Sequence, residues 1–150
     1  MERDNEYLEN KLDYIIKNHF NDVDFSNQVI IKFGKRSRRQ LGCIRREQDK
    51  SVLSIFNMIR AQSSNNYASI ITITAYFKLN TVPDEIVAST IAHELVHYVH
   101  GFNSPLPKKF KHPHKGNIVY KELAQRGLGD MYKSSKKWLK QNWKDIVTKS

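Results

Sequence analysis

The sequence of 150 residues is poor in cysteine and has no long apolar run. Its one cysteine, Cys43, cannot form an intrachain disulfide, which is typical of a reducing compartment such as the cytoplasm. No window approaches about 18 consecutive apolar residues, so we expect no transmembrane helix and no membrane partner. The charged segment 1–14 lacks the apolar core of a secretory signal peptide. We therefore expect a globular protein of the cytoplasm, or of the nucleoid or nucleus if it binds DNA.

Acidic residues are also scarce, since 15 Asp and Glu stand against 25 Lys and Arg, for a net charge of +10. The basic excess is concentrated in residues 101–150 and in a cluster within residues 35–46. A basic surface attracts phosphate backbones, so DNA is a candidate partner, although the charge can also serve solubility alone. The candidate DNA-binding residues of the two regions are Arg36, Arg38, Arg39, Lys136, Lys137 and Lys140.

The pattern of apolar residues predicts helices and strands in an order typical of an α+β protein. Apolar residues at helical spacing predict helices at residues 3–19, 83–100, 118 to 127 or 129, and 134–147. Runs of apolar, β-branched and aromatic residues predict strands at residues 29–35, 41–46, 51–59 and 70–80. This order predicts an α+β fold with a small, mainly antiparallel sheet. No linker divides the chain, so we expect one domain over residues 1–150 with its core at about 25–130.

The helix at 83–100 has sequence signals at both of its ends. Thr81 is the expected N-cap, Pro83 suits the first turn, and the acidic Asp84 favours the positive end of the helix. Gly101 is a natural stop. Residues four apart within this segment are therefore expected to share one face of a helix.

This helix carries the motif HELVH at residues 93–97. His93 and His97 share a face and can reach one ion, and a catalytic zinc site uses three protein ligands and a water molecule. Glu94 is placed to act as general base toward that water as it attacks a carbonyl group. A chance match to the motif is expected in roughly 1% of such sequences. The motif predicts a zinc site, and the alternative is a helix that is merely rich in histidine.

The third zinc ligand has several candidates. His100 shares the helix face, but it lies about 10 Å along the axis from His93, so we expect it beside the site rather than on the ion. His114 ranks first and His112 second, because the prolines before them suit a loop that folds back toward the helix. Glu122 ranks third, and a structural role for its carboxylate is favoured.

The layout resembles the SprT-like (SprT/Spartan) zincin metalloprotease family. The matching segments are "ITITAYFKLNTVPDEIVASTIAHELVHYVHGF" at residues 71–102, "HKGNIVYKELAQRGLG" at 114–129 and "RSRRQLGCIR" at 36–45. The resemblance covers roughly residues 25–130. It implies a zincin-like fold, in which the HExxH helix packs with the sheet, and His114 as the third zinc ligand. The best-known members of the family cleave proteins crosslinked to DNA and are stimulated by DNA.

The basic segment at 134–147 can serve two purposes. Its lysines alternate with Trp138 and Trp143, a pattern that suits nucleic acid because aromatic rings stack on unpaired bases. Trp143 also shares an apolar helix face with Leu139 and Ile146, which predicts docking on the core. We favour docking of Trp143, with the lysines left free for DNA.

Three functions follow from these patterns. The first is a zinc metalloprotease that acts on DNA-associated or DNA-crosslinked proteins. The second is a zinc peptidase unrelated to DNA, such as one that cleaves a regulator, and the third is a basic DNA-binding module without catalysis.

In zincins an edge strand beside the cleft pairs with the peptide, and the strand at 70–80 is a candidate because it precedes the metal helix. Tyr120 and His100 are candidates for stabilising the transition state.

Overall fold

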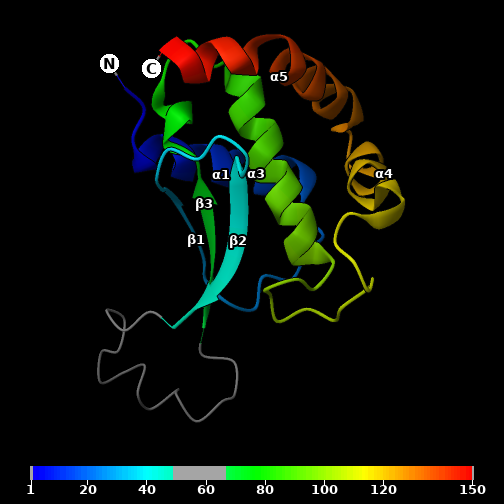
Figure 1. Ribbon diagram of the computed structural model, residues 1–150. Helices are drawn as coiled ribbons and strands as arrows, with labels where there is room; N and C mark the ends of the chain where they lie inside the picture. The colour runs from blue at the N-terminus through cyan, green and yellow to red at the C-terminus, as the bar shows by residue number, and fades with distance from the viewer. Residues whose placement is uncertain (1, 49–66, 150) are drawn as a thin grey trace.

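The structure is a computed structural model that describes residues 2–48 and 67–149 (Figure 1). Its α-helices in these residues are α1 (Asn5–His19), α3 (Asp84–Val99), α4 (Ile118–Gln125) and α5 (Gly129–Lys149). Its strands and short 3-10 helices are β1 (Val29–Phe33), β2 (Gly42–Glu47), β3 (Ala68–Ile73), η2 (Ala75–Lys78) and η3 (Lys115–Asn117). The predicted α+β class is confirmed, while the strand expected at 51–59 lies outside the described residues. Within 2–48 and 67–149, no helix combines the length and the apolar character needed to cross a membrane.

The described sheet is mixed, so the expectation of a mainly antiparallel sheet was wrong. Its strand order is β1-β3-β2, with β3 parallel to β1 and antiparallel to β2. Although β1 and β2 follow one another along the chain, they do not pair, because β3 lies between them. Every residue of β3 except Thr72 is buried. A strand this apolar suits the central position, where both of its edges are paired and helices such as α3 pack on the sheet.

β3 ends at Ile73, whereas the sequence predicted a strand that continues to residue 80. Thr74 accounts for the early end. Its hydroxyl donates to the Ser37 carbonyl at 2.8 Å, and its own N–H donates to the Leu41 carbonyl at 2.8 Å. These bonds tie the end of β3 to the basic turn before β2, and the chain then coils into η2. Both aromatic residues of η2 are buried, so they build the core from a helical turn instead of a strand.

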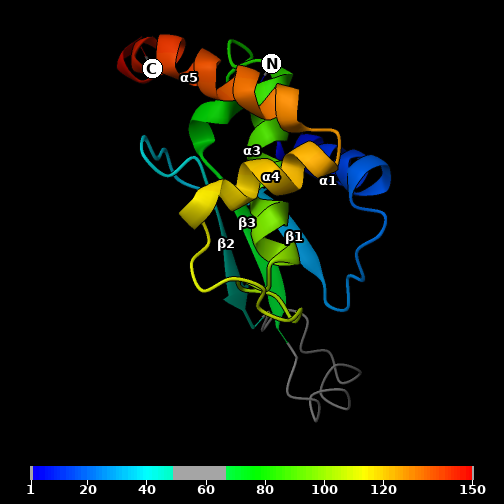
Figure 2. The ribbon, with the colours of Figure 1, turned by 90° about the vertical axis from the view of Figure 1, so that its right-hand side faces the viewer.

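Helix α3 lies at the centre of the fold, in contact with β2, β3, α1, α4 and α5 (Figures 1 and 2). It spans Asp84–Val99, within one residue of the predicted 83–100 at each end. The N-cap is Pro83 in an extended conformation and not Thr81, so the predicted cap was wrong. Gly101 follows the helix with a φ of 85°, a left-handed conformation that glycine adopts readily, and the predicted stop is confirmed.

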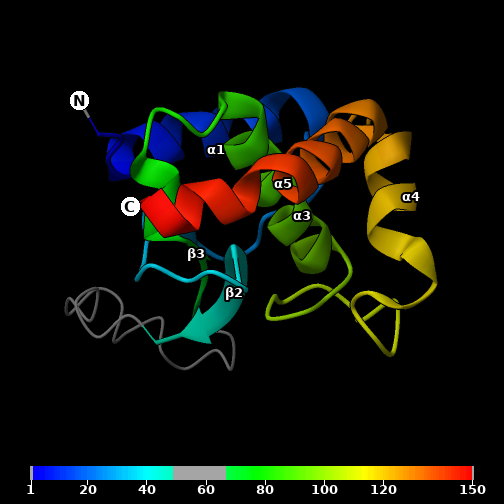
Figure 3. The same cartoon turned by 45° about the horizontal axis from the view of Figure 1, so that its top comes forward.

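Helix α5 crosses α3 and carries the docked tryptophan (Figure 3). It begins at Gly129, five residues before the predicted start at 134. The Trp143 ring makes edge contacts with Tyr76 and Phe77, at centroid distances of 5.6 and 5.7 Å. Its Nε1–H donates to the Arg38 carbonyl at 2.8 Å. The predicted docking of Trp143 is confirmed, and the same bond holds the basic turn before β2 against α5.

The core of the sheet predicts a specific loss of stability. Ile71 of β3 is fully buried and lies in register between Ile31 of β1 and Ile44 of β2, which are also buried. Replacing it by alanine removes buried methyl groups and leaves a cavity, so Ile71→Ala should lower the free energy of unfolding by about 2–5 kcal/mol in urea titrations. The control is Tyr14→Ala, because this side chain is 66% exposed and should change stability by about 0.5 kcal/mol or less. Equal effects of the two variants would contradict this description of the core.

Candidate metal centre

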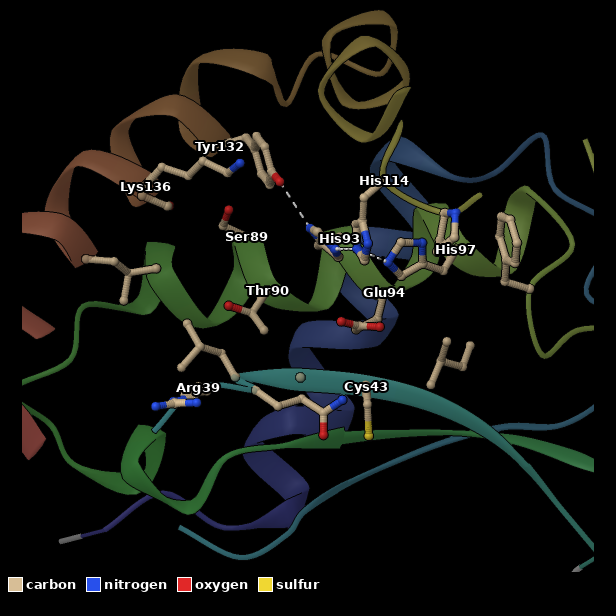
Figure 4. Close-up of a pocket in the computed structure, with 18 of the residues that line it drawn as sticks. Arg39, Cys43, Ser89, Thr90, His93, Glu94, His97, His114, Tyr132 and Lys136 are labelled. Carbon is tan, nitrogen blue, oxygen red and sulfur yellow. Dashed lines mark hydrogen bonds between the residues drawn. The ribbon is translucent and has the colours of Figure 1, made fainter. Parts of the chain in front are cut away.

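Three histidines from two separate segments meet beside α3 (Figure 4). His93 and His97 project from successive turns of α3, as their four-residue spacing predicts. His114 precedes η3 and reaches both of them. Its Nε2 lies 3.1 Å from Nε2 of His93 and 3.0 Å from Nε2 of His97. One ligand nitrogen from each residue lies within 4.8 Å of the other two, so the three can bind one metal ion.

The three nitrogens fit a zinc ion in spacing and in chemistry. A tetrahedral zinc with Zn–N bonds of about 2.0–2.1 Å holds its ligand nitrogens about 3.3–3.4 Å apart, close to the separations found here. Burial, followed by the neighbouring histidines, lowers the pKa of His93 to about 3 and that of His97 to about 4. Both rings are therefore neutral near pH 7, and neutral imidazole is the form that binds metals.

The Nδ1 atoms of the two helix histidines, His93 and His97, differ in their partners. Nδ1 of His93 lies 3.1 Å from the hydroxyl oxygen of Tyr132, within hydrogen-bond distance (Figure 4). If Nε2 binds a metal, Nδ1 carries the proton and donates it to this oxygen. Tyr132 belongs to α5 and is 6% exposed. No spacing in the sequence pointed to it, because its contact depends on how α5 packs on α3. Nδ1 of His97 is buried without a partner among the described residues, and such atoms are usually satisfied by water.

Glu94 is a buried carboxyl group beside the histidines. It is 4% exposed, and its side chain points from α3 toward β2 (Figure 4). A Cβ atom at Gly42 would lie 3.2 Å from Glu94 Oε1 and 2.9 Å from Thr90 Cγ2, so glycine allows β2 to approach this close. Burial raises the pKa of Glu94 to about 8. A cation held by the neighbouring histidines would favour the ionised form and lower this pKa.

The histidines and Glu94 line a cavity of about 620 Å³ between α3, β2 and α5. Residues 39–44 form one wall, and β2 lies at an edge of the described sheet. The sequence left open whether the strand at 70–80 takes this edge position, and the structure shows that it does not, because β3 is the central strand of the described sheet. The apolar character that made this segment a clear strand is the reason for its central place.

The other candidates for the site lie outside the histidine cluster. His112 is exposed and is not part of it. Glu122 accepts a hydrogen bond from His100 Nε2–H at 3.0 Å and another from Arg126 Nε–H at 3.0 Å, so its carboxylate has the structural role that the sequence favoured. His100 is buried and, like Tyr120, does not line the cavity, so neither faces the position of a reacting peptide.

The basic residues singled out in the sequence are all exposed: Arg36, Arg38, Arg39, Lys136, Lys137 and Lys140. Arg39 and Lys136 also line the cavity, from the turn before β2 and from α5. The bond from Trp143 to the Arg38 carbonyl holds this turn next to α5. The two basic regions, far apart in the sequence, therefore meet at the cavity through Arg39 and Lys136.

No protein-family model, no curated protein and no solved structure matches this chain.

The histidine cluster predicts zinc binding that depends on His114. Elemental analysis of protein purified without chelators should find about one zinc per chain, and His114→Ala should lose most of it. His112→Ala is the matched control, because it removes an exposed histidine two positions away and should keep the zinc. Retention of zinc in His114→Ala with loss in His112→Ala or Glu122→Ala would overturn the ligand set.

Proposed function

We propose that this chain is a zinc-dependent metalloendopeptidase that acts on proteins associated with DNA or crosslinked to it. The observation that carries the proposal is the buried carboxyl group of Glu94, which lines the cavity beside the three histidines. Burial is the cause of its raised pKa. A zinc site with a purely structural role needs no such group, whereas hydrolysis needs a base in this position. The resemblance to SprT-like zincins supports the same function.

In this proposal His93, His97 and His114 hold the ion through their Nε2 atoms. Bound zinc would supply a Lewis acid that makes a water molecule more acidic and polarises the carbonyl group of the scissile bond. Glu94 accepts the proton of the attacking water at a carboxylate oxygen and passes it to the leaving amine. With Nε2 of His93 on the metal, Nδ1 would carry the proton, and the Tyr132 hydroxyl oxygen 3.1 Å away would accept this hydrogen bond, which orients the ring.

Strand β2 is the proposed binding site for the peptide backbone. It is an edge strand of the described sheet, and residues 41–44 line the cavity. An extended peptide can pair with main-chain groups of such an edge, and that pairing does not depend on the peptide's side chains. The Ile44 carbonyl is already engaged, because it accepts a hydrogen bond from Asn103 Nδ2–H at 2.9 Å. A peptide bound there would run between β2 and α3 and present a carbonyl group near Glu94.

DNA is proposed as a partner on the basis of the exposed basic residues beside the cavity. The turn that carries Arg36, Arg38 and Arg39 is held against α5, which carries Lys136, Lys137 and Lys140. Exposed basic residues on two adjoining segments give affinity for a phosphate backbone. Protein crosslinked to such DNA would be held next to the mouth of the cavity.

A zinc peptidase unrelated to DNA is the second candidate function. Arg39 and Lys136 line the cavity itself, so this part of the positive charge can serve the recognition of an acidic substrate. A DNA-binding module without catalysis is the third candidate, and it leaves the buried Glu94 without a role.

The proposed chemistry predicts that Glu94→Gln separates zinc binding from catalysis. The amide cannot accept the proton of the attacking water, so cleavage of a fluorescent unstructured protein should fall by about 100-fold or more while the zinc content stays near one per chain. Glu85→Gln is the control, since Glu85 is an exposed acid on the same helix and should keep full activity. A fully active Glu94→Gln enzyme would refute the assignment of the base.

The proposed DNA-binding surface predicts a change in salt dependence. We expect Arg38→Ala, Lys137→Ala and Lys140→Ala together to weaken DNA binding, with the slope of log K against log salt falling by about 1 for each phosphate that is no longer neutralised. These exposed residues do not line the cavity, so cleavage of a peptide without DNA should be unchanged. Lys17→Ala on α1 is the control. Unchanged DNA binding, or none in the native protein, would favour the peptidase unrelated to DNA.

A further inference from the structure

His100 lies three residues beyond His97 and faces away from the cavity. Its ring is 2% exposed, and Nε2–H donates to Glu122 Oε1 at 3.0 Å. Its backbone carbonyl accepts a hydrogen bond from the Lys109 N–H at 2.9 Å. His100 therefore contacts two distant parts of the chain at once, one before His114 and one after it.

The contacts before His114 fold the loop back over the end of α3. Besides the bond from Lys109, the Phe110 ring packs on the His100 ring with centroids 4.8 Å apart. Gly101 makes this approach possible, because a Cβ atom there would lie 2.5 Å from the Pro107 carbonyl oxygen and 2.6 Å from Lys108 Cα. The loop is thus seated directly on the residue that follows the helix.

The contacts after His114 hold α4 through Glu122. One oxygen of this carboxylate accepts from His100, and the other accepts from Arg126 Nε–H at 3.0 Å. Arg126 in turn donates to both carboxylate oxygens of Asp22, at 2.6 and 3.2 Å, and to the His19 carbonyl at 2.8 Å. Glu122 is 17% exposed and is fixed from two sides. Helix α4, which follows His114 through η3, is therefore attached to α3 through its middle and to the end of α1 through the residue at its C-terminal end.

His114 itself has little that fixes it locally. It is exposed, and its side-chain contacts within the described residues are with His93 and His97. The two residues that follow Lys115, Gly116 and Asn117, both have positive φ, at 78° and 59°. A ligand on such a segment loses conformational freedom on binding metal unless the chain on each side of it is already held.

We propose that His100 and Glu122 are positioning residues, which hold His114 in place for the metal by fixing the chain on both sides of it. The proposal rests on the metal centre proposed above. Residues that orient metal ligands typically change metal affinity by about 10- to 100-fold when they are replaced. Glu122, which the sequence ranked third as a candidate zinc ligand, would then contribute to the site by positioning His114.

The test is a double-mutant cycle read out by zinc affinity, measured by competition with a chromophoric chelator. Glu122→Ala in the native background should weaken zinc binding by about 10-fold or more. In the His114→Ala background, where His93 and His97 still bind zinc weakly, Glu122→Ala should change the affinity by less than about 2-fold, because the residue it positions is gone. Unfolding free energies measured in excess chelator separate any loss of stability from the loss of affinity.

Two further variants test whether misfolding, or a general effect of changing the surface of α4, could explain the loss of affinity. Phe110→Ala loosens the loop from His100 at a side chain that is 40% exposed, and it should weaken zinc binding in the same direction as Glu122→Ala. Lys121→Ala, at the exposed neighbour of Glu122 on α4, should leave the affinity unchanged.

The outcomes distinguish the two proposals. Native protein that binds no zinc would overturn the metal centre and this inference with it. Native zinc binding that is insensitive to Glu122→Ala and Phe110→Ala would overturn only the positioning role. Equal losses from Glu122→Ala with and without His114 would also overturn it, because the residue would then act through α3 or through overall stability.

Discussion

The burial of α3 is the constraint on which the rest of the structure depends. Eleven of its sixteen residues are buried, so the helix needs cover on almost every side. The sheet, α1, α4 and α5 provide this cover, and each of them contacts α3. Close packing of this kind keeps side chains in single rotamers. A metal site requires ligand side chains that are held in a fixed geometry. A helix with a broad solvent-exposed face would place the same histidines with much less precision.

The parts of the candidate site that could be predicted from the sequence are those set by local geometry. A helix places residues i and i+4 on one face, so the relation between His93 and His97 follows from their spacing once the helix is recognised. His114 ranked first because prolines precede it, which is a weaker signal. Tyr132 carried no signal, and Gly42 was indicated only by the family resemblance, because their roles depend on how α5 and β2 pack against α3. The spacing of residues along the chain does not predict tertiary contacts of this kind.

The errors in the predicted fold have the same origin. The composition of residues 70–80 indicated burial correctly, but burial can be achieved by a strand or by a helical turn. Thr74 decides between them through its bonds to the neighbouring basic turn, and these form only in the folded protein. The pairing of the sheet was predicted from chain order, whereas the most apolar strand took the central position.

One end of strand β2 borders the cavity, and the other end carries charged residues. Its first residues, Gly42 and Cys43, border the cavity, while Arg45, Arg46 and Glu47 are exposed. Edge strands that expose apolar residues along their whole length invite pairing with other protein molecules, and charged residues are a common defence against it. In β2 that defence covers only the end away from the cavity. If a peptide pairs with β2 as proposed, it would therefore meet the uncharged end of the strand, while the charged end disfavours pairing with other protein molecules.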